Sequence, residues 1–390
     1  GACLWAVLAV SGASGARPVA ENGSNGAVTP PSNVNYTTTL AKTFDVDLDL
    51  PPAQRWDAAI KGINPQGLEK AIEAYVSDTA GLSELEIETL FKAAGSLEKS
   101  LYNDEAEELR ALAKALNVDV GAIAFINFIY ELRKLGGGVT NHTPSTTHYG
   151  ACSGLVAQDT SGAVFHARNL DWKIPTPLES LTFTCNFIKD GQPLFVGTCV
   201  LGTIGPLTAM RPGAYAVQIN ERALGGSPIL DSLEAIVRGA TVMLATLRRA
   251  FIEAATYDEA VDALSTMRIT APVYYIMSGA EKGQGMILTR DRESVRDKFP
   301  LTDDQWYVYE SNYDHWEAPP AGDNRRKYAL AWIEKAGRGV VATDQGVLDA
   351  MDAWPVANEC TAQTILMNAA KGEYFAWLRD YTGPGSCHTE

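Results

Sequence analysis

The chain has 390 residues, of which 46% are hydrophobic and 20% are charged, a balance typical of a folded globular protein. Its 32 Lys and Arg residues against 47 Asp and Glu residues give a formal net charge of -15 at pH 7. Because such a charge repels phosphate groups, it argues against nucleic acid as a partner.

The N-terminus carries a short apolar run followed by small residues. Residues 4–10 read LWAVLAV, and Ser14-Gly15-Ala16 come shortly after them. This order is typical of the core and cleavage site of a secretory signal peptide. We therefore expect residues 1–16 to be a signal peptide whose start is missing, and the mature protein to enter the secretory pathway. No later stretch approaches the roughly 20 apolar residues that a membrane span needs.

Residues 17–40 are rich in Gly, Asn, Ser, Pro and Thr and show no apolar period, so they predict a flexible leader. Three N-glycosylation sequons agree with the secretory route, at Asn22, Asn35 and Asn141.

The sequence from about residue 41 to residue 135 is helical in its periodicity. A capping box at Ser83 to Glu86 precedes apolar residues spaced by three and four, namely Ile87, Leu90, Phe91, Ala94, Leu97 and Leu101. A second helix carries its apolar stripe at Leu109, Leu112, Ala113 and Leu116, and a third is predicted over residues 120–135. After three glycines, the polar residues 139–150 predict an exposed linker.

From residue 152 onward the periodicity becomes that of strands interrupted by helices. Strands are predicted at 152–158, 163–168, 181–188, 192–199, 213–219, 272–278, 284–290, 305–311, 362–367 and 373–379. Helices are predicted at 228–255, 257–267, 324–336 and 343–353. Sheets whose faces are covered by helices form an α+β layered architecture, which is the predicted fold class.

Six cysteines are scattered along the chain, and none of them forms a C-x-x-C pair that would offer half of a zinc site. We therefore expect neither a metal nor a cofactor. The disulfide pairing among Cys185, Cys199, Cys360 and Cys387 stays open.

Cys152 is the candidate nucleophile, because it lies between small residues where the linker meets the first strand. A lone cysteine is more often a small buried hydrophobe, so its context has to support a catalytic role. A hairpin would bring Arg168 and Asp171 back beside Cys152. There the guanidinium would favour the thiolate, and the carboxylate would orient the arginine or hold a protonated amine. The alternative is a surface Arg/Asp pair that caps the hairpin.

Six blocks occur in a recognisable order: Cys152-Ser-Gly-Leu-Val-Ala-Gln-Asp, His166-Ala-Arg-Asn-Leu-Asp171, Asn220-Glu-Arg222, Thr289-Arg-Asp-Arg292, Ser311-Asn-Tyr-Asp-His-Trp316 and Asp323-Asn-Arg-Arg326. Together they resemble the signature of the lysosomal N-terminal-nucleophile amidases, the cysteine hydrolase family of N-acylethanolamine-hydrolyzing acid amidase and acid ceramidase.

The resemblance implies an αββα N-terminal-nucleophile sandwich and a precursor that cuts itself between Ala151 and Cys152. Residues 41–151 would become a helical α-subunit, and residues 152–390 a catalytic β-subunit that pairs with it as an α/β heterodimer. The α-amino group freed on Cys152, with a reference pKa of about 7.7 to 8.0, would be the general base for its own thiol.

The resemblance also implies a catalytic set of Cys152, Arg168, Asp171, Glu221, Asn312 and Arg325. In this set Asn312 supplies an oxyanion donor, while Glu221 and Arg325 complete the polar network. The alternatives are a turn asparagine for Asn312 and an exposed ion pair for Glu221. If Glu221 is buried near Asp171, repulsion between the carboxylates would tie activity to acidic pH.

We predict structural roles for the remaining charged residues of these blocks, Arg290, Asp291, Arg292, His166 and His315.

The implied activity is lysosomal hydrolysis of N-acylethanolamines to fatty acid and ethanolamine, with transient docking to a membrane or lipid micelle. Gln158 and the residues after Asn312 favour this substrate slightly over ceramide, whose hydrolysis to sphingosine and fatty acid is the first alternative. The second is a secreted, non-catalytic lipid-binding protein in which Cys152 is only a core residue.

Overall fold

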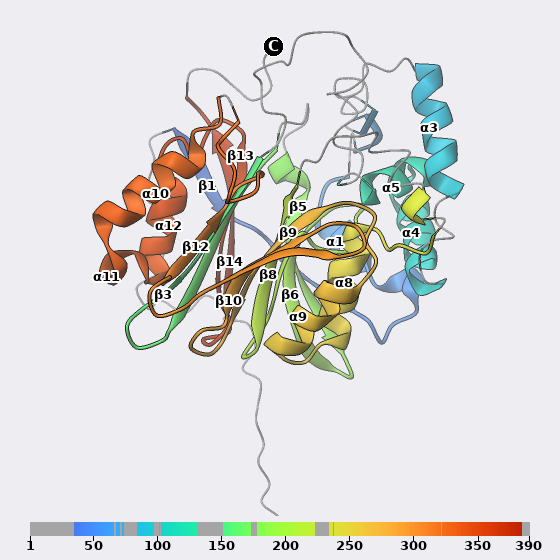
Figure 1. Cartoon of the computed structure of the whole chain (residues 1–390). Helices are drawn as coiled ribbons and strands as arrows, with labels where there is room; N and C mark the ends of the chain where they lie inside the picture. The colour runs from blue at the N-terminus through green and yellow to red at the C-terminus, as the bar shows by residue number, and fades with distance from the viewer. Residues whose placement is uncertain are drawn as a thin grey trace, which may run out of the picture.

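Two β-sheets stack face to face, and helices cover both outer faces (Figure 1). The structure is a computed structural model that describes residues 35–65, 68–70, 72–73, 84–96, 101, 103–128, 130, 151–172, 178–222, 234–236, 238–320 and 322–383. This arrangement is the layered α+β architecture that the sequence predicts.

The first sheet has six strands in the order β1-β14-β13-β4-β3-β12, and all neighbours are antiparallel. Its strands are β1 (Tyr36–Leu40), β14 (Glu373–Tyr381), β13 (Thr361–Asn368), β4 (Val164–Asp171), β3 (Ala151–Gln158) and β12 (Tyr307–Glu310). The central β3–β4 hairpin pairs Cys152 with Leu170 and Gly154 with Arg168. The predicted hairpin is therefore confirmed.

The second sheet has eight strands in the order β11-β10-β9-β8-β7-β6-β5-β2. They are β11 (Val295–Pro300), β10 (Gly285–Arg290), β9 (Val273–Gly279), β8 (Tyr215–Glu221), β7 (Thr208–Arg211), β6 (Gln192–Val200), β5 (Thr182–Lys189) and β2 (Thr43–Asp47). Only the β2–β5 pair is parallel among these described strands.

The helices form two groups, one on each side of the stacked sheets (Figure 1). The helices α10 (Arg325–Ala336), α11 (Arg338–Val341) and α12 (Asp344–Asp352) share a core with the six-stranded sheet. The other side carries α8 (Met243–Glu253) and α9 (Tyr257–Thr266), then the N-terminal α1 (Asp57–Gly62), α3 (Glu84–Ser96), α4 (Asn103–Leu116) and α5 (Val120–Asn127). Short 3-10 turns occur at Pro52–Gln54 and Leu178–Leu181. None of the helices in the described residues is long and apolar enough to cross a membrane.

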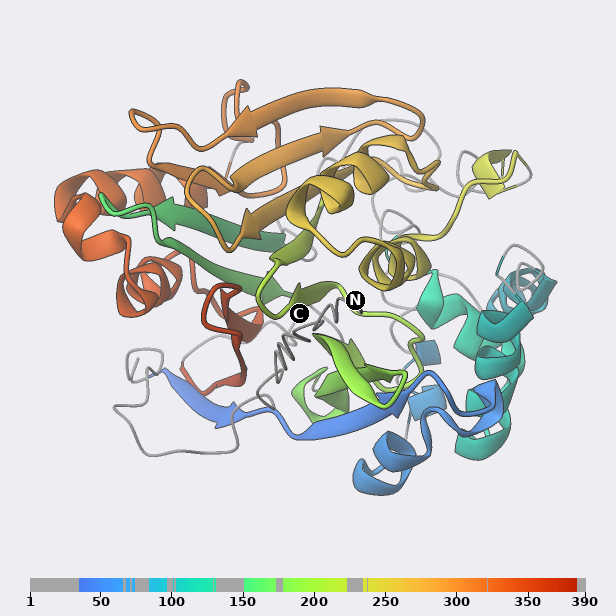
Figure 2. The same ribbon diagram turned by 90° about the horizontal axis from the view of Figure 1, so that it is seen from below.

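The N-terminal segment contributes one edge strand to each sheet, β1 beside β14 and β2 beside β5 (Figure 2). The prediction of a flexible leader over residues 17–40 is therefore wrong for Tyr36–Leu40. The sequence YTTTL is mostly polar and therefore resembles a loop. This composition fits an edge strand, in which four of the five residues are exposed to solvent. Its Thr residues nevertheless suit an extended backbone.

The predicted helix over residues 228–255 is wrong in part: residues 234–236 are helical, but residues 238–242 are not, and α8 begins at Met243, while residues 228–233 and 237 lie outside the described residues. Before α8, Thr241 forms a β-bridge with Ile269, so the chain is extended there. The strands β2, β7 and β11 were not predicted from the sequence, and β2 (Thr43–Asp47) corrects the prediction that the chain is helical from about residue 41. The capping residue Ser83, the linker 139–150 and the end of the predicted helix 120–135 lie outside the described residues.

Candidate active site

Cys152 is the second residue of β3, at the end of the central hairpin, and its side chain is buried. Successive strand residues point to opposite faces. Val156, on the same face as Cys152, belongs to the core between the sheets, whereas Leu155 belongs to the core under α12. The thiol therefore points toward the eight-stranded sheet and is a free cysteine.

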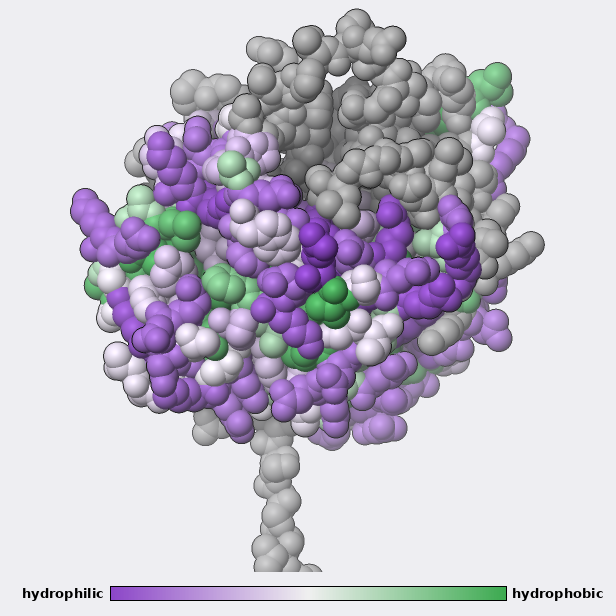
Figure 3. Space-filling view, viewed as in Figure 1, coloured by the Kyte–Doolittle hydropathy of each residue, from purple (hydrophilic) through white to green (hydrophobic). Residues whose placement is uncertain are grey.

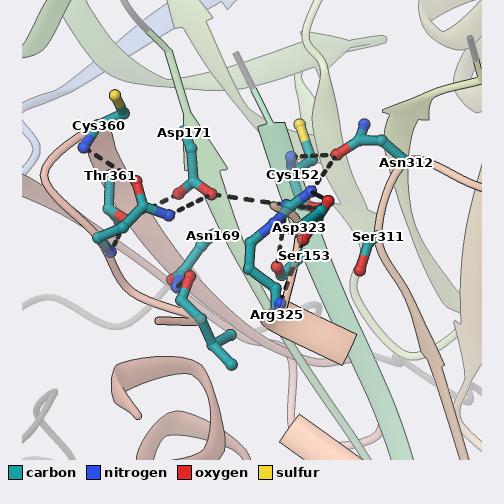
Figure 4. A network of polar contacts seen from close by, with 12 residues as sticks. Cys152, Ser153, Asn169, Asp171, Ser311, Asn312, Asp323, Arg325, Cys360 and Thr361 are labelled. Atoms are coloured by element: carbon teal, nitrogen blue, oxygen red, sulfur yellow. Dashed lines mark hydrogen bonds and ion pairs between the residues drawn. The ribbon is translucent and has the colours of Figure 1, made fainter. Parts of the chain in front are cut away.

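Asn312 follows β12 and joins the two sheets at Cys152 (Figure 4). Its Oδ1 accepts a hydrogen bond from the backbone N–H of Cys152 at 2.7 Å. Its Nδ2 donates to the backbone carbonyl of Glu221, at the end of β8, at 3.0 Å. The structure thus holds the Asn312 amide from both ends, with its oxygen toward Cys152.

Arg325, the first residue of α10, reaches the same point from the helical layer (Figure 4). Its Nη1 donates to the Cys152 carbonyl at 2.7 Å, and its Nη2 donates to Asn312 Oδ1 at 3.1 Å. The guanidinium is buried and is balanced by Asp323, whose Oδ2 lies 2.6 Å from Nη2. Such charge-assisted hydrogen bonds are the strong ones in a dry site.

Asp171, the last residue of β4, is completely buried on the helix-facing side of the sheet. Its Oδ2 lies 3.7 Å from Arg325 Nη1. It also accepts hydrogen bonds from Thr361 Oγ1 at 2.7 Å and from Asn358 Nδ2 at 3.1 Å. Burial raises the pKa of the Asp171 carboxyl, while Arg325 and these two hydrogen bonds act in the opposite direction. Asp171 is thus linked to Cys152 through Arg325.

Arg168 and Glu221 lie differently from what the sequence suggested. Arg168 crosses the space between the sheets, where Nη1 donates to Thr208 Oγ1 at 2.6 Å. Its Nε and Nη2 have no hydrogen-bond partner within the described residues. Glu221 is half-buried and enters the site through its main-chain carbonyl. Of the five residues predicted to accompany Cys152, Asn312 and Arg325 contact it directly, and Asp171 and Glu221 contact one of those two. Arg168 lies two residues deeper along the hairpin.

Sequence reasoning missed several polar groups in the site. Ser153 is buried, and its Oγ accepts a hydrogen bond from Tyr309 at 3.1 Å. Thr361 and Asn358 follow α12, far from Asp171 in the sequence, so no local signal links them. Glu310 is fully buried two residues before Asn312, and burial raises the pKa of its carboxyl to about 8. The one sequence feature that could have pointed to Glu310 is its position directly before the block that begins at Ser311.

The residues with predicted structural roles make structural contacts. Arg290 donates to the carbonyls of Leu264 and Met267 at the end of α9. His166 hydrogen-bonds Ser278 and Gln218 between the sheets, and burial lowers the pKa of its imidazole to about 3. His315 stacks on Phe299, with ring centroids 4.4 Å apart.

Asp291 forms an ion pair with Arg222 at 2.5 Å, and Arg292 donates to the carbonyl of Thr270.

Three of the cysteines, Cys152, Cys185 and Cys199, are free, while Cys360 forms a disulfide. Cys3 and Cys387 lie outside the described residues, as do the sequons at Asn22 and Asn141. Asn35 lies just before β1 and is half-buried. The described part of the chain holds no group of three His, Cys, Asp or Glu residues suited to a metal ion.

The face shown in Figure 3 is mainly hydrophilic, and its apolar residues are scattered rather than gathered in one patch. The docking of the protein to a membrane or micelle stays a prediction.

The chain matches no model of a known protein family. It is 28% identical to acid ceramidase from Homo sapiens over 378 residues, which cover 91% of this chain and 90% of that protein. It is also 28% identical to N-acylethanolamine-hydrolyzing acid amidase from Mus musculus over 340 residues, which cover 86% of this chain and 88% of that protein.

A solved structure of the Caenorhabditis elegans ortholog of N-acylethanolamine-hydrolyzing acid amidase superposes with a TM-score of 0.53 and 29% identity. The match covers 58% of this chain and 99% of that chain. These similarities confirm the predicted resemblance and the predicted fold.

Proposed function

Because this chain is related over most of its length to acid ceramidases and N-acylethanolamine-hydrolyzing acid amidases, we propose that it is an amide hydrolase with Cys152 as its nucleophile. The observation that carries the proposal is the convergence of Asn312 and Arg325 on the backbone of Cys152. A cysteine that is only a core residue needs no such convergence of buried polar groups.

The first reaction is self-cleavage between Ala151 and Cys152. The Cys152 sulfur attacks the Ala151 carbonyl carbon, and the Cys152 nitrogen leaves and takes up a proton, which gives a thioester. Water then hydrolyses the thioester, which releases the Ala151 carboxylate and the Cys152 thiol and leaves Cys152 as a new N-terminus with its free α-amino group. Asn312 Oδ1 already holds that nitrogen at 2.7 Å, so the leaving group is fixed before the bond breaks.

The second reaction uses the freed amine as the base for the thiol on the same residue. Cys152 adds to the substrate amide carbonyl, the ammonium protonates the departing amine, and water hydrolyses the acyl thioester. Asn312 continues to orient the amine through its oxygen. An amide nitrogen carries two hydrogens. One hydrogen of the Asn312 amide is donated to the Glu221 carbonyl. The second hydrogen is assigned to the oxyanion, and such a hydrogen bond contributes about 2.7–4 kcal/mol to transition-state stabilisation in comparable sites.

The two products of self-cleavage remain together as an α/β heterodimer. Support comes from β1 and β2, which are edge strands of the two sheets, and from buried ion pairs between α4 and α8. In addition, the 58% of this chain that matches the whole solved relative is close to the share that lies after Ala151.

The substrate is a lipid amide, and N-acylethanolamines are our first choice because both the mouse relative and the solved structure bear that name. Ceramide is the second choice, because the human acid ceramidase aligns over a larger share of both chains. The working compartment is the lysosome, reached through the secretory pathway.

The test is incubation of the purified chain at acidic pH, followed by a denaturing gel and N-terminal sequencing. We expect two fragments, of which the second begins at Cys152, and we expect turnover of palmitoylethanolamide. Cys152→Ala should abolish both, whereas Cys199→Ala, at a free buried cysteine of β6, should retain both. An unbroken chain that hydrolyses the amide would contradict the mechanism. Faster hydrolysis of ceramide would reverse the order of the substrates.

A further inference from the structure

The connection between α12 and β13 forms a compact turn at residues 358–361, here named the 358–361 turn. The Thr361 N–H donates to the Asn358 carbonyl at 2.9 Å, and the Asn358 N–H donates to Thr361 Oγ1 at 2.9 Å. Between them, the Cys360 N–H donates to Asn358 Oδ1 at 3.0 Å. The turn thus fixes the Asn358 amide and the Thr361 hydroxyl relative to each other.

These two side chains hydrogen-bond both oxygens of Asp171, and Figure 4 shows Thr361 next to Asp171. Thr361 Oγ1 donates to Oδ1 at 2.7 Å, and Asn358 Nδ2 donates to Oδ2 at 3.1 Å. The Cys360 carbonyl also accepts the N–H of Trp172, the next residue along the chain, at 2.8 Å. The end of β4 is therefore clamped through both its backbone and its side chain.

From Asp171 the contacts lead to the nucleophile in one further step. Asp171 lies 3.7 Å from Arg325, and Arg325 donates both to the Cys152 carbonyl and to the Asn312 oxygen that holds the Cys152 nitrogen. We propose that the 358–361 turn is a positioning element for the nucleophile, in which Thr361 and Asn358 hold the Asp171 carboxylate that sets the place of Arg325. This inference rests on the proposed role of Cys152.

Two further anchors hold the turn from outside. The Tyr36 hydroxyl, on β1, donates to the Asn358 carbonyl, and the Tyr36 ring lies under the Arg379 guanidinium at 4.3 Å. Cys360, inside the turn, is disulfide-bonded. Since β1 precedes the proposed cut, the N-terminal segment supports the active site of the mature enzyme and is more than a precursor that covers it.

The charged and titratable groups around Asp171 set the direction of the pH effect. They are Arg325 on α10, Arg168 on β4 and Tyr36 on β1. Burial raises the pKa of Asp171, and the hydrogen bond from Thr361 opposes that rise. Loss of the hydroxyl therefore raises the pKa further, and the enzyme should lose its ionised Asp171 at a higher pH.

The experiment compares Thr361→Val with Thr364→Val, a matched control three residues along the same strand. Thr364 is equally buried, but its hydroxyl donates to Asn169 rather than to Asp171. For Thr361→Val we expect kcat to fall about tenfold and the acidic limb of the pH profile to move up by about one unit, with KM little changed. Thr361→Ser should restore both, and Thr364→Val should keep the wild-type profile.

Tyr36→Phe and Cys360→Ser should shift the profile in the same direction by a smaller amount. A folded, active Thr361→Val enzyme with the wild-type kcat and profile would overturn the inference.

A second readout, the pH dependence of Cys152 alkylation by iodoacetamide, separates this inference from the proposed function. If the wild-type chain hydrolyses no amide, the proposed function fails. The positioning role then stands or falls on whether Thr361→Val, and not Thr364→Val, shifts the alkylation profile.

Discussion

The buried carboxylate of Glu108 on α4 offers a quantitative test of what holds the N-terminal helices to the catalytic sheets. Its Oε2 accepts from Arg248 Nη1 at 2.6 Å and from Trp56 Nε1 at 2.8 Å, while its Oε1 accepts from Arg248 Nη2 at 2.7 Å and from Arg55 at 2.6 Å. The Glu108 side chain is 0% exposed and the Arg248 side chain 3% exposed. Because both side chains are buried, neither charged group can become solvated by water when its partner is removed.

Glu108→Gln preserves the shape and removes the charge, which leaves Arg248 buried without a counterion. Breaking a buried pair in this way costs about 3–5 kcal/mol. We expect that loss in the free energy of unfolding, measured by urea denaturation in a Cys152→Ala background, so that the chain stays in one piece. Glu107→Gln, at the exposed neighbouring position, should change stability by less than about 0.5 kcal/mol.

The double variant Glu108→Gln/Arg248→Gln should lose less than the sum of the two single losses, because each single variant already breaks the same pair. Although burial raises the pKa of Glu108, Arg248 and the other donors outweigh it, so the pKa is lowered overall. The stabilisation is therefore complete above the usual glutamate pKa of about 4.3 and disappears only as the pH falls through the lowered value. A loss below about 1 kcal/mol at neutral pH would refute the reasoning.

Three other substitutions test the buried groups of the core. His166 has its pKa lowered to about 3, so the folded state resists protonation, and the protein should lose about 2–3 kcal/mol of stability between pH 7 and 4.5; His166→Gln should remove that loss in parallel urea titrations. Glu310 has its pKa raised to about 8, so its contribution is present at acidic pH and is lost as the pH rises; Glu310→Gln should stabilise the chain by about 3 kcal/mol at pH 7 and by little at pH 4.5. Gly121→Ala would place a Cβ 2.1 Å from the Phe91 carbonyl oxygen and should lower thermal stability by about 1–3 kcal/mol; Gly95→Ala, where the nearest atom is 3.6 Å away, should not.

The sequence predicted the helices and strands whose periodicity is strong. The structure differs from the prediction where contacts between distant parts of the chain determine the local conformation. The hairpin at Cys152 was predictable because the turn residues Asp159 to Gly162 separate two short extended segments. The edge strand Tyr36–Leu40 was not, since its ladder partner lies more than 330 residues away and most of its side chains face solvent. Residues 228–242 contain helix-forming residues, but their extended part pairs with Ile269.

The same reasoning applies to the candidate site. The blocks identified Asn312 and Arg325 as candidates, and both side chains contact the backbone of Cys152. Sequence could not show that Arg168 turns toward Thr208, because strand pairing fixes a face but not the rotamer of a long side chain. The role of Thr361 could not be predicted from the sequence either, because a single threonine belongs to no recognisable motif.

The placement of β1 and β2 at the outer edges of two different sheets determines how the protein can be produced. A polypeptide of residues 152–390 alone would expose the hydrogen-bonding edges of β14 and β5, which are templates for aggregation. Soluble enzyme should therefore require synthesis as one chain or co-expression of both pieces. Inhibitor screens on residues 152–390 alone would examine a molecule that lacks two strands of the sheets.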